Sequence, residues 1–412
     1  MQKEKPTAGC GEGVARMSQH EMMEGFPPAE SAQVTLANWR LPPFNRWAFQ
    51  NVRQVVPTAE VRRSTGPAAP VTRAAQPIDG IAFRAGDGRD WTVGELLAES
   101  ATDGLMVLRD GACVVERYDH GLRPETPHII FSVSKSVTGT LAGIVAGDGR
   151  LDPDAPVTRY IPEAAGSAYG DCTVRHVLDM TVSTDFVEDY LDPSGDFARY
   201  RVATGWNPVS GEPADLRSFL TTMRRGTGPH GAMFHYVSPN SDLLGWILER
   251  ATGTPYALLL SEELWQPMGA SEDAYVTVDR LGAPRSAGGL CVTLRDLARV
   301  GELMRRRGAA AGRQLVPESW IDDILTNGDR AAWRRGRAAG SILPDGRYRS
   351  KWYSVGDDHG AFCAIGIHGQ WIYVDPATAI VIAKLSSQPL PVDEAMEELQ
   401  LAGFAAIARG LG

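Results

Sequence analysis

Lysine and cysteine are both rare in this 412-residue chain, which contains five of each. The cysteines are widely spaced and form no C-x-x-C pair or Cys/His cluster, so the sequence predicts neither a disulfide framework nor a metal site. We therefore expect reduced thiols and a cytoplasmic location. No stretch approaches about 18 consecutive apolar residues, and the N-terminus lacks the apolar core of a signal peptide, so we expect no membrane span and no membrane partner.

Positive charge is also in deficit, because the formal net charge is −9 at pH 7. Nucleic-acid-binding surfaces are usually basic, so this balance argues against a nucleic-acid partner. Hydrophobic residues make up 43% of the chain and charged residues 22%, which is ordinary for a globular protein. A large buried core and a small-molecule partner are therefore expected.

Several common catalytic motifs are missing as well. The chain has no G-x-S-x-G elbow and no Walker A loop. Their absence argues against an α/β-hydrolase and a P-loop enzyme, and no cofactor is expected. The segment His20 to Glu24 approaches a zinc-protease helix, but Glu24 stands where the second histidine is needed, so no metal is expected.

The order of predicted elements favours an α+β fold. Residues 1–80 show no periodic pattern and are interpreted as a tail and a wrapping segment, with the aromatic patch 39–49 packed on the body. A hairpin is predicted at 105–116 around Asp110-Gly111, and a buried helix at 131–146. The middle of the chain reads mainly as helices, including 174–180, 216–225, 241–252 and 294–305, the last with Thr293 as its N-cap.

Near the C-terminus, strands are predicted at 364–368, 371–374 and 378–385, followed by a helix at 394–408. Strands therefore flank a helical middle. This order predicts an antiparallel sheet domain flanked by helices, formed discontinuously by residues 81–150 and 280–412, plus a mainly helical domain at 151–279.

The first candidate catalytic feature is the S-x-x-K sequence Ser132-Val133-Ser134-Lys135 at the start of the predicted helix. This spacing places the Ser132 and Lys135 side chains on one face, one turn apart. A serine hydroxyl needs a base to become nucleophilic, and a buried lysine can lose its proton whereas an arginine cannot. In a chain so poor in lysine, Lys135 within an apolar stretch is conspicuous. The alternative is a helix-capping serine followed by a surface lysine.

A second feature is Tyr236-Val237-Ser238-Pro239-Asn240, just before the predicted helix at 241–252. A tyrosine at a helix start can share a proton with a nearby lysine, and Asn240 can orient polar substrate groups. The alternative is a packing aromatic followed by a capping asparagine.

A third feature is Gly366-Ile367-His368-Gly369 in the late strand. Glycines at a strand position let a substrate approach the backbone, so an N–H there can complete an oxyanion hole. A purely structural role is the alternative for His368.

Taken in order, these features resemble the penicillin-recognising serine hydrolases, which include class C β-lactamases, DD-peptidases and related esterases. The closer likeness is to the 6-aminohexanoate-dimer (nylon-oligomer) hydrolases and their esterase relatives, and it runs from about Trp39 to the C-terminus. It rests on these three features and on further matching stretches at 45–49, 177–180, 188–190, 296–301 and 366–370.

The resemblance implies a β-lactamase/DD-peptidase-like fold and a role for each matching residue. Ser132 is then the acylated nucleophile, Lys135 the proton acceptor, and Tyr236 the general base and acid. The backbone N–H groups of Ser132 and Ile367 form the oxyanion hole. His368 stands where β-lactamases carry the lysine of a K-T-G motif, which favours an esterase over a β-lactamase. The likeness also implies a homodimer.

The sequence departs from the nylon-oligomer hydrolases at the implied substrate site. Phe186 occupies the position of a tyrosine that helps to hold the amide substrate, and Phe197 and Ala287 are also less polar than in those enzymes. Tyr190 and Asn240 complete the implied substrate-binding residues. A lost hydrogen bond of roughly 0.5–1.5 kcal/mol would weaken amide cleavage more than ester cleavage.

The main prediction is therefore hydrolysis of carboxylic esters, and of some linear amides, through an acyl-enzyme. Two alternatives stay open. One is a true amide hydrolase acting on 6-aminohexanoate oligomers, and the other is a non-catalytic binding protein on the same fold.

Overall fold

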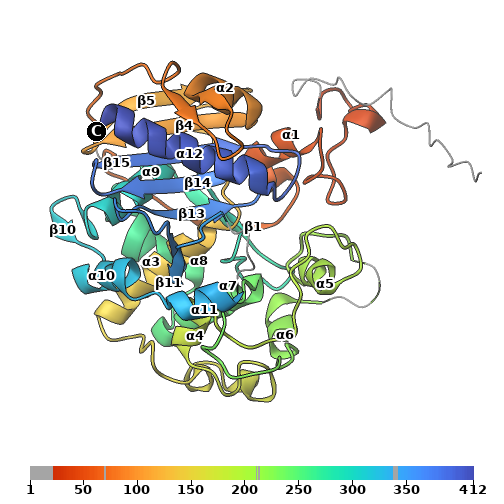
Figure 1. The fold of residues 1–412 in the computed structure, drawn as a ribbon. Coiled ribbons are helices and arrows are strands. Elements are labelled where there is room, and N and C mark those ends of the chain that lie inside the picture. Colours follow the sequence, from red (N-terminus) through yellow and green to blue (C-terminus); the bar gives the residue numbers. More distant parts are fainter. Residues whose placement is uncertain (1–21, 69–70, 210, 212–213, 337–341) are drawn as a thin grey trace, which may run out of the picture.

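The computed structural model describes all residues except 1–21, 69–70, 210, 212–213 and 337–341. Its largest element is a seven-stranded antiparallel sheet in the order β11-β12-β13-β14-β15-β4-β5 (Figure 1). Two distant parts of the chain form this sheet. The strands are β4 (Thr102–Arg109), β5 (Ala112–Tyr118), β11 (Arg347–Arg349), β12 (Trp352–Ser354), β13 (Phe362–Gly366), β14 (Gln370–Asp375) and β15 (Ile380–Ser386).

Helices cover both faces of the sheet, which explains why strand β15 reads as an almost continuous apolar run. Ile380 and Ile382 belong to the cluster formed with α2 (Val93–Glu99) and α12 (Glu394–Leu411). Val381 and Ala383 belong to the cluster formed with α9 (Leu294–Arg305) and α3 (Val133–Gly147). Successive residues thus face opposite layers, as the two-residue period of a strand requires.

The remaining helices lie mostly in the other half of the molecule, below the sheet in Figure 1. This half contains α4, α5, α6, α7 and α8, while α10 and α11 pack beside β11. The bounds are α1 (Asn45–Gln50), α4 (Val174–Leu178), α5 (Asp196–Ala203), α6 (Leu216–Thr221), α7 (Ser238–Thr252), α8 (Tyr256–Leu260), α10 (Glu318–Thr326) and α11 (Arg330–Gly336).

The predicted α+β class and its local signals are confirmed in several places. Asp110 and Gly111 both have positive φ, 47° and 79°, as a tight turn between β4 and β5 requires. The Thr293 side chain accepts a hydrogen bond from the Asp296 N–H and caps α9. Helix α6 is shorter than predicted and ends at Thr221.

A four-stranded sheet, which the sequence analysis did not predict, joins the N-terminal segment to the body. Its order is β1-β7-β8-β6, from β1 (Thr58–Val61), β7 (Ala274–Thr277), β8 (Leu290–Val292) and β6 (His128–Ile129). Two small hairpins complete the strands, β2 (Ala82–Arg84) with β3 (Asp90–Thr92) and β9 (Ala309–Ala310) with β10 (Arg313–Gln314).

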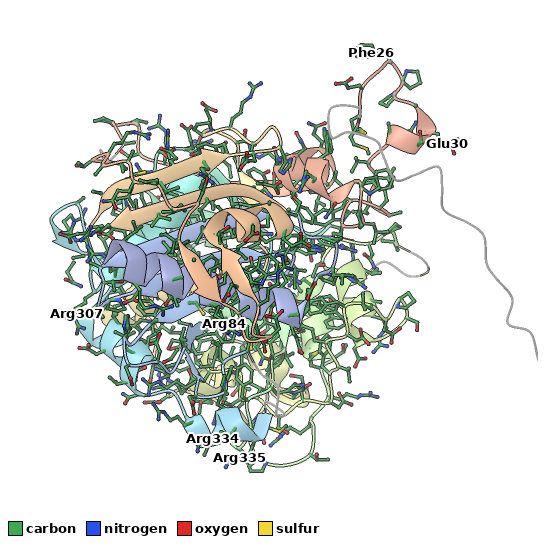
Figure 2. The ribbon with its side chains drawn as sticks, turned by 45° about the horizontal axis from the view of Figure 1, so that its top comes forward. Phe26, Glu30, Arg84, Arg307, Arg334 and Arg335 are labelled. Carbon is green, nitrogen blue, oxygen red and sulfur yellow. The ribbon has the colours of Figure 1, made fainter. Side chains whose placement is uncertain are left out.

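The predicted wrapping segment packs on the body through its aromatic patch, since Trp39 and Phe49 are fully buried. Further toward the N-terminus, a loop carrying Phe26 and Glu30 projects away from the body (Figure 2). The first part of the predicted tail, residues 1–21, lies outside the described residues.

Within the described ranges, no helix is long and apolar enough to cross a membrane. No group of three or more His, Cys, Asp or Glu side chains gathers there as metal ligands do. Four of the cysteines, Cys113, Cys172, Cys291 and Cys363, are buried and free, and Cys10 lies outside the described residues.

Candidate active site

Helix α3 carries the S-x-x-K sequence through the centre of the molecule. Ser132 is its N-cap residue and the helix proper begins at Val133. Two small residues let other segments approach: a Cβ on Gly139 would lie 2.3 Å from the Ser350 carbonyl oxygen, and one on Gly143 would lie 2.5 Å from the Trp320 ring. The small residues of this stretch therefore permit close packing, and the packing fixes the helix that carries the serine.

Lys135 contacts Ser132 directly. Its Nζ lies 2.7 Å from Ser132 Oγ and 2.8 Å from the Ala287 carbonyl oxygen. The side chain is almost fully buried, and burial lowers the pKa of Lys135 to about 7, partly opposed by the negative charge of Glu188. An uncharged amine is therefore well populated near neutral pH beside the hydroxyl.

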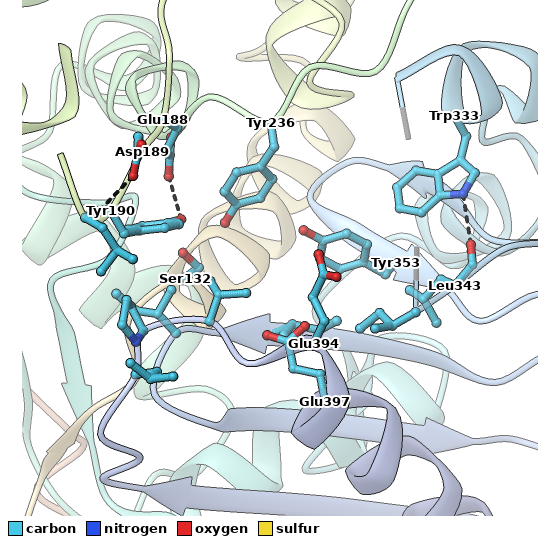
Figure 3. A pocket seen from close by; sticks show the side chains of 17 residues that line it. Ser132, Glu188, Asp189, Tyr190, Tyr236, Trp333, Leu343, Tyr353, Glu394 and Glu397 are labelled. Carbon is cyan, nitrogen blue, oxygen red and sulfur yellow. Dashed lines mark hydrogen bonds between the residues drawn. The ribbon is translucent and has the colours of Figure 1, made fainter. Parts of the chain in front are cut away.

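Tyr236 lies on the segment that enters α7 and faces the same two residues. Lys135 Nζ is 5.0 Å from the centroid of its ring, and the phenol oxygen points toward Ser132 (Figure 3). Helix α7 begins at Ser238, with Pro239 in its first turn, three residues earlier than the sequence predicted. The structure thus brings Ser132, Lys135 and Tyr236 together.

The backbone just before the nucleophile position is strained. Phe131 has φ of 42°, a conformation that costs a bulky residue roughly 1–3 kcal/mol and needs support from its surroundings. Its ring packs on Phe49 at 4.8 Å, Trp206 at 6.0 Å and Trp39 at 6.5 Å between centroids. The N-terminal wrapping segment therefore helps to hold the turn that presents Ser132.

The turn between β13 and β14 lies beside Ser132. A Cβ on Gly366 would lie 3.2 Å from the Ser132 backbone nitrogen and 2.6 Å from the Ile130 carbonyl oxygen, so only glycine allows this approach. Ile367 follows and lines the same cavity as Ser132. The oxyanion role of the two N–H groups stays a prediction, and their segments are adjacent.

His368 is not in a strand, as the sequence analysis expected, but in this turn, with φ of 61°. Its ring is buried against Phe49 and Phe131, and its Nδ1 lies 2.7 Å from the Gln388 carbonyl oxygen. Burial lowers the pKa of His368 to about 4. This packing agrees with the structural alternative for the His368 side chain, and a part in substrate binding stays a prediction.

The cavity at Ser132 has a volume of about 620 Å³ and mixes apolar walls with carboxylates (Figure 3). The apolar lining comes from separate segments and includes Leu191, Ile342, Leu343, Ile365, Leu390 and Val392. The carboxylates are Glu188, Asp189, Glu394 and Glu397. Such a surface suits an apolar substrate chain without negative charge.

Tyr190 lines this cavity, in agreement with its predicted place. Its hydroxyl donates to Glu188 Oε1 at 2.7 Å, and Glu188 also accepts hydrogen bonds from the Ser238 hydroxyl and N–H. Glu188 was not among the predicted site residues, although it belongs to the 188–190 stretch that carried the resemblance. Trp333, Tyr353, Glu394 and Glu397 were also missed, since no motif marks them.

Four predicted substrate-binding residues lie away from the cavity. Phe186 packs on Tyr200 and Phe219 and lines a separate cavity, and Phe197 packs edge-to-face on Tyr190 at 4.8 Å between centroids. Asn240 is buried inside α7 and accepts from the Tyr169 hydroxyl. Ala287 is fully buried, and its carbonyl contacts Lys135 rather than the cavity. Each of these side chains packs in the core, and a substrate-binding role for them stays a prediction.

An antiparallel sheet with helices on both faces, a helical half, and an S-x-x-K sequence opening a buried central helix define the class of penicillin-recognising serine hydrolases. The chain belongs to the β-lactamase family, whose family model matches residues 90–406. The chain is accordingly a hydrolase of this family.

Three similar proteins refine this placement. The chain is 40% identical to 6-aminohexanoate-dimer hydrolase from Paenarthrobacter ureafaciens over 389 residues, 94% of this chain and 96% of that protein. A structure from Bacillus anthracis, provisionally named a 6-aminohexanoate-dimer hydrolase, superposes with a TM-score of 0.84 at 27% identity, covering 92% of this chain and 97% of its own. Esterase EstB from Burkholderia gladioli is 28% identical over 170 residues, 38% of this chain and 41% of that protein.

Proposed function

We propose that the chain hydrolyses carboxylic esters through an acyl-enzyme on Ser132. The observation that carries this proposal is the 2.7 Å contact between Ser132 Oγ and the buried amine of Lys135. A lysine whose pKa is lowered to about 7 can accept the hydroxyl proton at neutral pH, which an ordinary lysine cannot do.

The reaction follows from this geometry. Ser132 Oγ attacks the ester carbonyl carbon while its proton passes to Lys135, and the carbonyl electrons move to the oxygen. That oxyanion accepts hydrogen bonds from the N–H groups of Ser132 and Ile367. The C–O bond to the leaving alcohol then breaks as Tyr236 donates its phenol proton to the alcohol oxygen, and Lys135 returns a proton to Tyr236. A water molecule then attacks the carbonyl carbon of the acyl-enzyme while Tyr236 and Lys135 act as the base that removes its proton. The bond to Ser132 Oγ breaks, the proton returns to Ser132, and the acid is released.

A second candidate is hydrolysis of 6-aminohexanoate-dimer amides. The 40% identity to a hydrolase of that name favours it. Esters remain the first candidate because an alkoxide leaves with less protonation than an amine does. Release of 6-aminohexanoate from the linear dimer, compared with ester turnover by the same preparation, separates the two.

The proposal is tested with a neutral p-nitrophenyl acyl ester. We expect a burst of p-nitrophenol equal to the enzyme concentration, and an intact-protein mass increased by the acyl group. Ser132→Ala should lose both. Ser136→Ala is the matched control, because its hydroxyl lies on the same helix but donates to the Lys351 carbonyl oxygen in the core.

Unchanged turnover in Ser132→Ala refutes the acyl-enzyme. Failure of the wild-type protein to take up any acyl probe favours the non-catalytic binding protein instead.

We also propose that the protein works in a reducing compartment such as the cytoplasm. Support comes from the four described cysteines, which are all buried and free.

A further inference from the structure

Behind Lys135 lies a buried carboxylate that reaches the lysine through a single residue. Asp242, on α7, is buried, and its Oδ1 accepts the Ala287 N–H at 2.7 Å. The carbonyl oxygen of the same Ala287 accepts a hydrogen bond from Lys135 Nζ at 2.8 Å. The position of Asp242 therefore sets the position of the acceptor that faces the lysine.

A buried arginine completes the arrangement. The Arg285 guanidinium donates to Asp242 Oδ2, and the Tyr200 hydroxyl contacts both groups. The side chains of Arg285 and Asp242 are 3% and 0% exposed. The pair is thus shielded from solvent, so its charges are screened less than surface charges are.

Ser286 lies between Arg285 and Ala287 in the chain, and hydrogen bonds to two helices fix its position. Its hydroxyl donates to the Ser241 carbonyl oxygen at 2.9 Å, and its own carbonyl oxygen accepts from Thr138 Oγ1 at 3.1 Å. Residues 285–287 are therefore attached to both α7 and α3. A buried ion pair adds little net stability compared with an apolar replacement, so stability alone does not account for its place here.

We propose that Asp242 and Arg285 are a positioning pair, which fixes the Ala287 carbonyl so that the Lys135 lone pair faces Ser132. This inference rests on the proposed function of Lys135 as the proton acceptor. An uncharged amine has two N–H groups and one lone pair. When the Ala287 carbonyl holds one N–H, the rotation of the amine is restricted and the lone pair can accept the Ser132 proton.

The charged groups around Lys135 allow the proposal to be tested by the direction in which the pKa of Lys135 shifts. Asp242 and Glu188 are negative and favour the charged amine, whereas Arg285 is positive and disfavours it. Lys351, which lies on the sheet side, is buried and has a strongly lowered pKa, and Tyr236 faces the amine from the cavity. Removing one member of the pair should therefore shift the Lys135 titration in a direction set by the charge that remains.

The experiment measures kcat, KM and the pH profile of kcat/KM for a neutral p-nitrophenyl ester. We call the fall of kcat/KM at low pH, where Lys135 becomes protonated, the acidic limb of this profile. In Asp242→Asn the remaining Arg285 charge lowers the pKa of Lys135 and so moves the acidic limb to lower pH. In Arg285→Met the remaining carboxylate moves it to higher pH. The limb midpoint is independent of the amount of folded enzyme, so partial folding does not obscure it.

Ser286→Ala keeps both charges and removes only a small buried group, so it serves as the variant that folds. We expect about a tenfold lower kcat, with KM changed less than twofold and the limb unmoved, because the Ala287 carbonyl is held less firmly. Asp296→Asn is the matched control: Asp296 is also buried, pairs with Arg299 and accepts loop N–H groups, but it is not among the charges that shift the pKa of Lys135. Its limb should stay at the wild-type pH.

Limb shifts in the same direction in both charge variants, no shift in either, or a wild-type kcat in Ser286→Ala would each overturn the inference. Ser132→Ala is measured in parallel. If it retains activity, the acyl-enzyme itself is refuted. If it is inactive while the other variants behave as wild type, only the positioning pair is refuted.

Discussion

The two ends of the Ser132 cavity are built differently. At the reacting end, Lys135 is 2% exposed and Ser132 and Tyr236 are carried by segments that enter buried helices. At the mouth, Leu191 is 74% exposed and Leu390 is 50% exposed, both on irregular segments. The difference indicates that core packing fixes the chemistry, whereas exposed loops that tolerate change set the substrate.

The largest effect should come from removing the base. Lys135→Met keeps the length and apolar body of the side chain but cannot accept a proton, so acylation should fall by about 10³-fold. The measurement is the burst rate with a p-nitrophenyl ester. Lys384→Met is the matched control, since Lys384 is also a buried lysine, bonded to Ser386 in strand β15, and should retain a rate within about threefold. An equal fall in the burst rate of both variants would contradict the role of Lys135 as the base.

Tyr236→Phe should lower kcat by about 10²-fold, because it removes the proton carrier to the leaving group but leaves the lysine in place. Tyr353→Phe offers a comparison on the same cavity. A loss in Tyr353→Phe as large as that in Tyr236→Phe would contradict the assignment.

The pH dependence of kcat/KM tests the reacting end of the cavity. The pKa of Lys135 is lowered by burial to about 7, and the uncharged form is the base. Below that value kcat/KM should therefore fall about tenfold per pH unit, and above it kcat/KM should level off. The profile of wild-type enzyme tests this, and a limb near pH 10, where an ordinary lysine titrates, would contradict it.

Substitutions at the mouth should change substrate preference by a smaller factor. Leu191→Ser and Leu390→Ser remove apolar surface that a long acyl chain would cover, so KM for an octanoyl ester should rise roughly fivefold. The acetyl ester, which does not reach the mouth, serves as the internal control. Equal effects on both esters would show that the mouth does not contact the chain.

The smallest effect is expected at Phe186. The family resemblance implies that a tyrosine there assists amide cleavage, but the ring lines a separate cavity and packs against Tyr200 and Phe219. Phe186→Tyr should therefore change the ratio of amide to ester turnover less than twofold, because the new hydroxyl does not face the substrate. A larger gain in amide turnover would restore the original expectation.

Local sequence signals predicted the Ser132–Lys135 helix turn and two further features of the fold. The S-x-x-K spacing, the Asp110-Gly111 turn and the Thr293 cap depend on neighbours within a few residues, and the structure contains each of them. Strands β6 and β8 have only two and three residues and pair across a long stretch of chain, so no periodicity marks them.

The substrate end was predicted less well for the same reason. Glu188, Trp333 and Glu394 meet only through the tertiary fold. Asn240 lies within α7 rather than before it, and His368 lies in a turn rather than in a strand. A one-turn shift of a helix start, or a turn at the end of a strand, changes the direction of a side chain, and short-range patterns do not mark either.

The scarcity of lysine allows a direct test of the central claim. Protein labelled with carbon-13 at the lysine ε position should give few lysine signals, and the signal lost in Lys135→Met identifies the residue. We expect that signal to titrate near pH 7, since an uncharged amine beside Ser132 is what the mechanism requires. A Lys135 signal that remains in the charged form until about pH 10 would contradict the account.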